Sequence, residues 1–439
     1  MEKMDGRKLL LVSLMIFSMF FGAGNLIFPP MLGQLSGTNL VISMGGFMIS
    51  AVGLPILAIA AVAKVGGLHI LASRVHPRFA LAFTILIYLS IGPFLGIPRA
   101  ASLAFEMGVS PFLSEALGNS QLPLFLYTVI YFAIAFWLGM SPSKLVDRFG
   151  KFLTPILLIL LTSVFTASLF KPIGVLAAPI GDYAQFPFLK GFLEGYLTMD
   201  AIAALNFGIV ISIALKEMGV TEETGLITNT IKAGTIAGLV LAIIYGMLAY
   251  LGAASTTRFG TTENGAQIFT NVVFYLFGQK GSILVGLIFS LACLTTSVGL
   301  LTSCSQYFAK LTPKVSYKTF MALLSGLSMV FANVGLTQIL KVSVPVLTAI
   351  YPMAIALIVL ALFHNCFQGN SYVYLFTMIF TSLVSILEAL GQFGLKVNLL
   401  TILPLYAKGL GWIIPAVVGA IVGLVYGNLR KRGKYPIPN

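Results

Sequence analysis

The sequence has little charge. Charged residues make up 9% of its 439 positions, whereas about 25% is usual for a soluble globular domain. No polar stretch is long enough to fold into a separate soluble domain. Hydrophobic residues make up 58% of the chain, and the mean hydropathy is +0.99. These values exclude an ordinary soluble protein and predict an all-α polytopic membrane protein.

Residues that hold metals or carry out acid–base chemistry are also scarce. The chain has three cysteines, three histidines and 13 acidic residues. The cysteines, Cys293, Cys304 and Cys366, form no CxxC motif, and the acidic residues are scattered. We therefore expect no disulfide framework, no metal or haem cofactor and no catalytic residues. A channel is disfavoured because no selectivity-filter motif is present.

Long apolar runs recur from one end of the chain to the other. A run of about 20 residues can cross a bilayer as a helix. We predict twelve such spans, which make the whole chain, residues 1–439, one integral membrane domain. The spans lie at residues 9–34, 40–63, 79–105, 121–140, 150–170, 190–216, 228–252, 281–310, 318–335, 342–363, 372–391 and 409–429.

The lysines and arginines are distributed unevenly between the two sides of the membrane. The formal net charge is +13, and a cytoplasmic N-terminus places 18 of the 26 basic residues inside and seven outside. Excess positive charge marks cytoplasmic loops, so both termini are predicted in the cytoplasm of a cell-membrane protein. The basic inner face fits anionic headgroups, so membrane lipids rather than nucleic acid are its expected partners.

The first span contains its own helix breakers, in the stretch "FFGAGNLIFPP" from Phe20 to Pro30. Gly22 and Gly24 expose backbone N–H and C=O groups to a ligand, and Asn25 is polar among apolar neighbours. A helix broken inside the membrane presents an N-terminal end that attracts a carboxylate and a carbonyl end that attracts a cation. A proline kink used only for packing is the alternative.

A second break is predicted five spans later, in "TMDAIAALNFG" from Thr198 to Gly208. Transporters with one broken helix repeat the device in the corresponding helix of their second half. Asp200 is expensive to place inside a membrane and is a functional candidate for that reason. It either caps the second half-helix or contacts the cation or substrate directly.

The eighth span carries consecutive hydroxyls in "LACLTTS" from Leu291 to Ser297. Thr295 and Thr296 point about 100° apart on a helix, so both can turn toward one neighbouring helix. Hard cations prefer oxygen ligands, and hydroxyls with carbonyls supply them without a buried charge. A small-residue helix interface is the alternative.

These three motifs, at these spacings, resemble the bacterial branched-chain amino acid:cation symporter family over nearly the whole chain. The resemblance implies a leucine-transporter-like fold, with a five-plus-five inverted repeat, broken first and sixth helices and two extra helices. The repeats would cover residues 9–170 and 190–363, and the extra helices residues 372–429. It also implies import of leucine, isoleucine and valine by alternating access, in symport with Na⁺ or another monovalent cation, and we expect Na⁺. A proton-coupled amino acid permease of the same fold is the alternative.

The resemblance implies two groups of binding residues. Those expected to hold the amino acid are Gly22, Ala23, Gly24, Asn25, Thr198, Asp200, Ala201 and Ala204. Those expected to hold the monovalent cation, through carbonyls and hydroxyls, are Ser18, Phe21, Ala292, Thr295 and Thr296. No cofactor other than the coupling ion is expected.

Two further segments border the expected pocket. In the third span, Arg99 and Glu106 are seven residues apart and share one helix face. They are a structural pair, two interfacial residues that snorkel, or an outer gate. The segment 261–277 has the apolar spacing of an amphipathic outer lid.

Overall fold

The structure is a computed structural model of the chain and describes residues 4–114, 120–394 and 398–432. Within these ranges the chain is all-α, and no strand is present. This confirms the predicted fold class. The orientation prediction also counts three residues that lie outside the described ranges, namely Lys3, Lys396 and Lys434.

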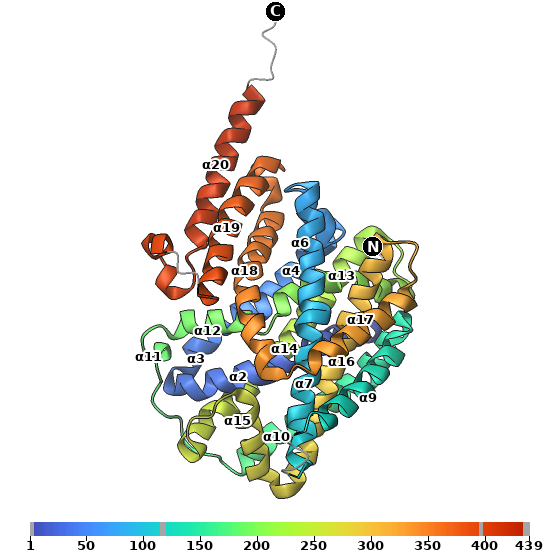
Figure 1. Cartoon of the computed structure of the whole chain (residues 1–439), viewed down its shortest axis with the longest axis vertical. Helices are drawn as coiled ribbons and strands as arrows, with labels where there is room; N and C mark the ends of the chain where they lie inside the picture. Colours follow the sequence, from blue (N-terminus) through green and yellow to red (C-terminus); the bar gives the residue numbers. More distant parts are fainter. Residues whose placement is uncertain (1–3, 115–119, 395–397, 433–439) are drawn as a thin grey trace, which may run out of the picture. The chain divides into compact units, whose positions relative to one another are not determined.

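Each predicted span is mainly helical in the described chain (Figure 1). Among the described residues, ten segments are long and apolar enough to cross a membrane, and the chain is a multi-pass membrane protein. The predicted first span divides between two helices, and the predicted ninth forms a helix of 16 residues. The α-helices are α1 (Gly6–Phe20), α2 (Ala23–Ser36), α3 (Leu40–Met48), α4 (Leu54–Val65), α5 (Leu68–Ser73), α6 (Pro77–Leu89), α7 (Gly96–Gly108), α9 (Leu122–Gly139), α10 (Thr154–Phe170), α11 (Asp182–Gln185), α12 (Pro187–Tyr196), α13 (Asp200–Glu217), α14 (Glu223–Phe259), α15 (Gly265–Phe277), α16 (Gly281–Leu311), α17 (Tyr317–Ala332), α18 (Leu336–Leu362), α19 (Ser371–Gln392) and α20 (Ile413–Arg432).

The chain divides into two compact units. The first comprises Met1–Ala60 and Leu89–Leu340, and the second comprises Ala61–Tyr88 and Lys341–Asn439. The first unit holds both motifs predicted to break a helix and the hydroxyl motif of α16. Everything that positions the candidate site therefore lies within one unit.

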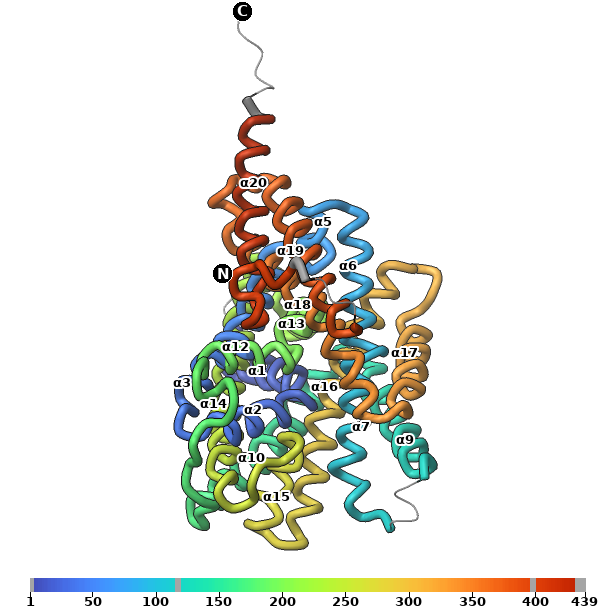
Figure 2. Tube along the Cα trace, turned by 60° about the vertical axis from the view of Figure 1, so that its left-hand side comes forward, coloured from blue at the N-terminus to red at the C-terminus, as the bar shows by residue number. Residues whose placement is uncertain are grey.

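Glycines bring α2 and α14 into direct backbone contact in the first unit, and the two helices lie side by side (Figures 1 and 2). A Cβ on Gly33 would lie 1.9 Å from the Ala249 carbonyl oxygen. In the other direction, a Cβ on Gly252 would lie 2.0 Å from the Pro30 carbonyl oxygen. Small residues allow this approach between membrane helices, where packing replaces the hydrophobic effect as the driving force. The contact fixes α2 beside α14.

In the second unit, glycines likewise bring α19 and α20 into direct backbone contact. A Cβ on Gly419 would lie 2.6 Å from the Phe376 carbonyl oxygen, and one on Gly423 would lie 2.4 Å from that of Tyr372. Tyr374 lies between these two contacts on α19, and its hydroxyl accepts a hydrogen bond from Arg74 (3.0 Å).

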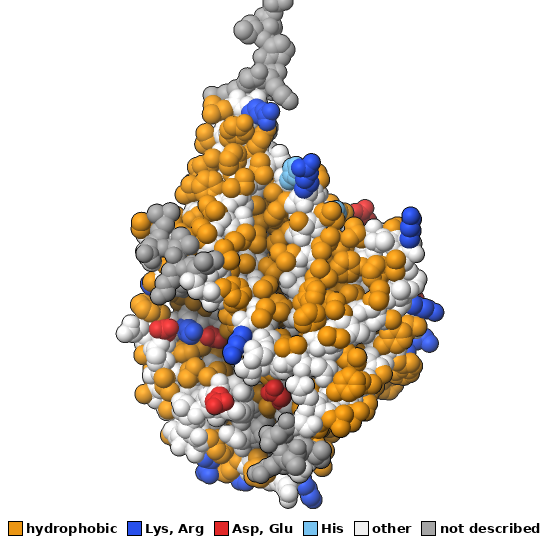
Figure 3. All heavy atoms as spheres, in the orientation of Figure 1, with side chains coloured by type: hydrophobic (Ala, Val, Ile, Leu, Met, Phe, Trp, Pro, Cys, Tyr) orange, Lys and Arg blue, Asp and Glu red, His pale blue; other side chains and the backbone are white. Residues whose placement is uncertain are grey.

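The exterior of the described helices is apolar. Hydrophobic side chains cover most of the face drawn in Figure 3, with charged side chains few and scattered. Trp137, Ile159 and Phe170 are each more than half exposed. Such a surface is stable against lipid tails and would be a liability in water.

Candidate functional site

The first helix is broken at Phe21 and Gly22. Helix α1 ends at Phe20, Gly22 is extended (φ −126°, ψ −150°), and α2 begins at Ala23. The Gly22 N–H donates to the Asn25 Oδ1 (2.9 Å), so Asn25 closes the start of α2. The predicted break is confirmed. The prolines do not cause it, because α2 continues through both of them.

The sixth span is broken between Tyr196 and Asp200, where α12 ends and α13 begins. Met199 has a left-handed backbone (φ 69°), which costs a residue with a side chain about 1–2 kcal/mol. The Thr198 hydroxyl donates to the Gly195 carbonyl (2.9 Å) and accepts from the Asp200 N–H (3.5 Å). Strained backbone of this kind clusters at binding and switch regions. The second predicted break is also confirmed.

The Asp200 carboxylate joins the two breaks. Its Oδ2 accepts hydrogen bonds from the Asn25 Nδ2 (2.7 Å) and from the Tyr245 hydroxyl of α14 (2.7 Å). Asn25 also donates to the Tyr245 hydroxyl, and all three residues are buried. The capping interpretation of Asp200 is wrong, because Met199 occupies the N-cap position and Asp200 is the first residue of α13. There the helix dipole favours a negative charge.

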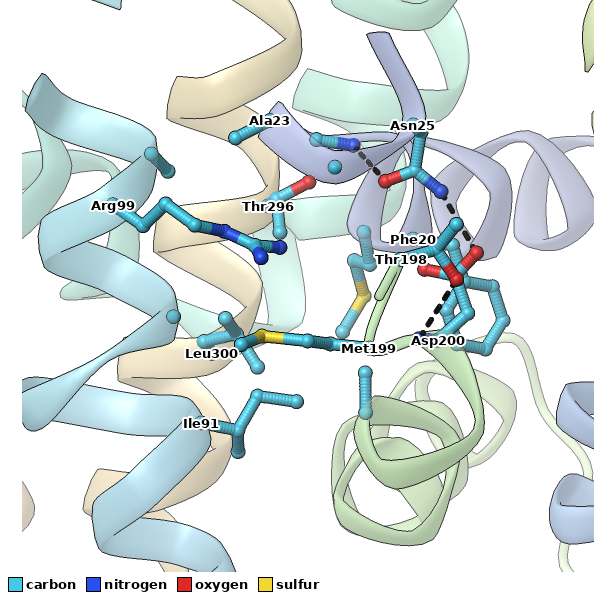
Figure 4. A pocket seen from close by; sticks show the side chains of 16 residues that line it. Phe20, Ala23, Asn25, Ile91, Arg99, Thr198, Met199, Asp200, Thr296 and Leu300 are labelled. Carbon is cyan, nitrogen blue, oxygen red and sulfur yellow. Dashed lines mark hydrogen bonds between the residues drawn. The ribbon is translucent and has the colours of Figure 1, made fainter. Parts of the chain in front are cut away.

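A small cavity lies between the two breaks (Figure 4). Its volume is about 30 Å³, far below the ~300–1,000 Å³ of typical ligand pockets. The cavity in this structure is therefore too small to hold an amino acid. Its lining includes six of the eight residues predicted to hold the substrate, namely Gly22, Ala23, Gly24, Asn25, Thr198 and Asp200.

The other two predicted residues lie outside this lining. Ala201 and Ala204 are buried in α13, and Ala203 lines the cavity in their place. The remaining apolar lining includes Ile91 and Leu300. The cavity lining therefore combines polar groups of the two breaks with aliphatic groups.

Carbonyls and hydroxyls of α1 and α16 meet beside the first break. The Thr295 Oγ1 donates to the carbonyls of Ser18 (3.0 Å) and Ala292 (3.1 Å). The Thr296 Oγ1 donates to the same Ser18 carbonyl (3.3 Å). A Cβ on Gly22 would lie 2.7 Å from this Thr296 oxygen, so the break passes directly over it.

Four of the five residues predicted to hold the cation are thus brought together. The fifth, Phe21, precedes Gly22 and is buried, with its ring stacked on that of Phe17 (5.2 Å between centroids). Oxygen groups alone form this cluster, which suits a hard cation better than a transition metal. Among the described residues, no group of three or more His, Cys, Asp or Glu side chains could hold a metal ion.

Arg99 of α7 enters the cavity from the side opposite Asp200 (Figure 4). It is 5% exposed and lines the cavity, and its Nη1 donates to the Leu197 carbonyl at the second break (3.3 Å). Its Nη2 lies 2.9 Å from where a Cβ on Gly24 would stand. Figure 4 shows this side chain extending from α7 toward the middle of the cavity. The interpretation of Arg99 as an interfacial residue that snorkels is wrong.

The expected outer lid forms the helix α15. A Cβ on Gly265 would lie 1.7 Å from the Ile27 carbonyl oxygen, so α15 begins directly against α2. The Asn264 side chain accepts hydrogen bonds from the N–H groups of Ala266 and Gln267, both 3.0 Å. Helix α15 is therefore fixed to the half-helix that lines the cavity.

Sequence reasoning missed two groups of this site, because each depends on tertiary contact. Tyr245 is a tyrosine in an apolar span, and only its polarity singles it out. Met199 carries no signal, since left-handed backbone is normally marked by glycine or asparagine.

Comparisons with known proteins agree with this architecture. The structure resembles Mhp1, a nucleobase-cation-symport-1 family transporter, in a closed conformation with bromovinylhydantoin bound (TM-score 0.60, 13% identity, 98% of this chain and 94% of that one). It also resembles MhsT in complex with L-phenylalanine (TM-score 0.58, 17% identity, 96% of this chain and 98% of that one). These likenesses show the leucine-transporter-type fold, as predicted. The boundaries of the two repeats stay a prediction.

Sequence relatives identify the family. The model for "Branched-chain amino acid transport protein" matches residues 5–430. The branched-chain amino acid permease BrnQ of Bacillus subtilis is 46% identical over 98% of this chain and 99% of its own length. A branched-chain amino acid transport system 2 carrier protein of Pseudomonas aeruginosa is 41% identical over 98% of both chains. The chain therefore belongs to the branched-chain amino acid transport protein family.

Proposed function

We propose that this protein imports leucine, isoleucine and valine across the cell membrane in symport with Na⁺, by alternating access and with both termini in the cytoplasm. Family membership supports the substrate class. The observation that carries the mechanism is the meeting of both helix breaks at one cavity, next to an oxygen cluster that shares α1 with it.

The mixture of polar and apolar groups in the cavity lining suits an amino acid with an aliphatic side chain. The N-terminal end of α2, at Ala23 and Gly24, offers backbone N–H groups to a carboxylate. Ala203, Ile91 and Leu300 offer an apolar surface to a branched side chain. One methylene more or less in such a pocket changes affinity by about 10–200-fold. We therefore expect leucine, isoleucine and valine to compete for one site, and lysine and glutamate to be rejected.

The cation is proposed to bind at Ser18, Ala292, Thr295 and Thr296, with the carbonyl of Phe21 as a further ligand. Ser18 precedes the first break by one turn of α1. Because cation and amino acid would share this break, each should raise the affinity for the other by the same factor.

Proton coupling is the second candidate, and one observation favours it. Asp200 is a buried carboxylate in a membrane span that lines the cavity, and such groups often carry protons in transporters. It is hydrogen bonded to Asn25 and Tyr245 rather than to the oxygen cluster of α16. The two candidates therefore place the coupling ion on different sides of the broken first helix.

Uptake of labelled leucine into proteoliposomes distinguishes these candidates. A Na⁺ gradient imposed at equal pH should drive accumulation, and a pH gradient without Na⁺ should not. The reverse result would replace Na⁺ with H⁺. Equal uptake of lysine or glutamate would overturn the proposed substrate class.

Variants of the hydroxyl pair test the cation site directly. Thr296→Ala removes an oxygen and should raise the Na⁺ concentration for half-maximal uptake, while Thr296→Ser keeps the oxygen and should be mild. Thr295→Ala should behave like Thr296→Ala. Thr302→Ala, seven residues beyond Thr295 on α16, is the matched control and should leave the Na⁺ dependence unchanged. A packing role predicts the reverse order, because alanine packs well between membrane helices.

A further inference from the structure

The proposed function gives no role to Arg99, a charged side chain that lines the cavity. Arg99 carries a permanent positive charge and is 5% exposed, within a segment that is long and apolar enough to span a membrane. Arginine at such a depth is costly, and it is normally retained where it meets a substrate or an opposite charge. The Arg99 side chain extends into the cavity (Figure 4).

We propose that Arg99 binds the carboxylate of the substrate and makes the cavity selective for α-amino acids over amines. This inference rests on the proposed amino acid substrate. It adds a side-chain contact to a carboxylate site that would otherwise be formed by backbone N–H groups alone.

The position of the guanidinium supports this role. Its Nη1 reaches the Leu197 carbonyl at the second break, and its Nη2 lies against Gly24 at the start of α2. The N-terminal end of α2 carries a partial positive charge of its own. Two positive groups therefore face the same space, and an anion placed between them would be held by both.

The hydrogen bond to Leu197 can be exchanged for a stronger one. It is 3.3 Å long and ends on a neutral carbonyl. A carboxylate is a charged acceptor that can take two parallel bonds from a guanidinium, and such bonds are roughly twice as strong as neutral ones.

The charges around the cavity match a zwitterion. Arg99 and Asp200 line it with one positive and one negative formal charge, so their sum is zero. A zwitterionic amino acid leaves this balance intact, with its carboxylate toward Arg99 and its ammonium toward Asp200. An amine without a carboxylate would bring an uncompensated positive charge toward Arg99, at a cost in a site shielded from water.

Leucine and leucinamide form a ligand pair that isolates this contact. Leucinamide keeps the ammonium and the side chain of leucine and replaces the carboxylate with a neutral amide. Binding of both would be measured by displacement of labelled leucine from the purified protein in Na⁺. We expect the wild-type protein to prefer leucine. Arg99→Gln should weaken leucine binding by about 10- to 100-fold, as loss of a charged hydrogen bond does. It should leave leucinamide binding unchanged or stronger, because the ammonium then no longer approaches a buried positive charge.

A second arginine of the same unit serves as the matched control. Arg148 also donates to a backbone carbonyl, that of Leu138, and lies over the Trp137 ring (5.0 Å to the centroid). It does not line the cavity. Arg148→Gln should therefore leave both affinities unchanged.

Two results for Arg99→Gln would overturn the proposal. Equal loss of leucine and leucinamide binding would indicate a structural role, and unchanged leucine binding would remove Arg99 from the carboxylate site. If Arg99→Gln does not fold, Arg99→Lys decides. Lysine keeps the positive charge but cannot form the two parallel hydrogen bonds of a guanidinium. Arg99→Lys should therefore reduce the preference for leucine over leucinamide, and an unreduced preference overturns the proposal. A wild-type protein that binds no leucine would refute the proposed function instead.

Discussion

The substitution Gly24→Ala tests whether the first break is a binding surface or only a bend. A Cβ at this position would lie 2.9 Å from the Arg99 Nη2, 3.0 Å from the Thr198 Cα and 3.2 Å from the Leu197 carbonyl oxygen. The last two are backbone atoms of the second break and cannot rotate away. The added methyl group therefore forces the two breaks apart or displaces the guanidinium.

The size of the effect follows from these contacts. Overpacking by a methyl group typically costs about 1–3 kcal/mol. Without substrate, the Arg99 side chain can yield to the methyl group. A bound substrate would keep Arg99 in place, so its contact with the methyl group would weaken binding, whereas the contacts with the backbone of Thr198 and Leu197 also destabilise the protein without substrate. At about 1.4 kcal/mol per tenfold change, Gly24→Ala should weaken leucine binding by about 5- to 150-fold. The larger Gly24→Val should abolish transport.

The assay combines leucine binding with thermal unfolding of the purified protein. Gly246→Ala is the matched control, because it adds the same methyl group to α14, where a Cβ meets no described heavy atom within 4 Å. It should change neither affinity nor transport. Gly24→Ala should lower affinity while the protein stays folded. Normal leucine affinity in Gly24→Ala and normal uptake by Gly24→Val would show that the break is only a bend.

Three other predictions use contacts elsewhere in the chain. Gly33→Ala would place a Cβ 1.9 Å from a backbone carbonyl of α14, so it should lower the thermal unfolding midpoint by more than Gly246→Ala changes it. Tyr245→Phe removes the hydroxyl that donates to Asp200 and should lower leucine uptake at saturating Na⁺ by about tenfold or more, measured as an initial rate. Burial, with a nearby arginine, holds the pKa of His364 below its usual value, so the neutral form is favoured in the folded state. Thermal stability should therefore fall as the pH drops through about 6.5, and less so in His364→Gln.

The two breaks could be predicted because their signals are local. Gly22, Gly24 and Asn25 interrupt an apolar run, and Asp200 marks the start of the second half-helix. Each feature is visible in a window of a few residues. The hydroxyl pair of α16 could be matched to Ser18 only through the family resemblance, because no local rule indicates which helix faces it.

The rotation of α13 could not be predicted. Adjacent residues on a helix lie about 100° apart, so the side that faces the cavity depends on the residue at which the helix begins. With α13 starting at Asp200, the cavity lies on the side of Ala203 rather than that of Ala201 and Ala204. The burial of Arg99 was equally unpredictable, because seven-residue spacing gives a shared face but not what that face meets.

The paired glycine contacts between α2 and α14 fix the distance between these two helices. Gly33 and Gly252 each hold one backbone against the other, so neither helix can slide without a collision or a gap. Spin labels on these two helices should report one constant separation through every stage of transport. The pair thus supplies a rigid frame of reference, against which any movement of α1 about Phe21 and Gly22 during transport would be measured.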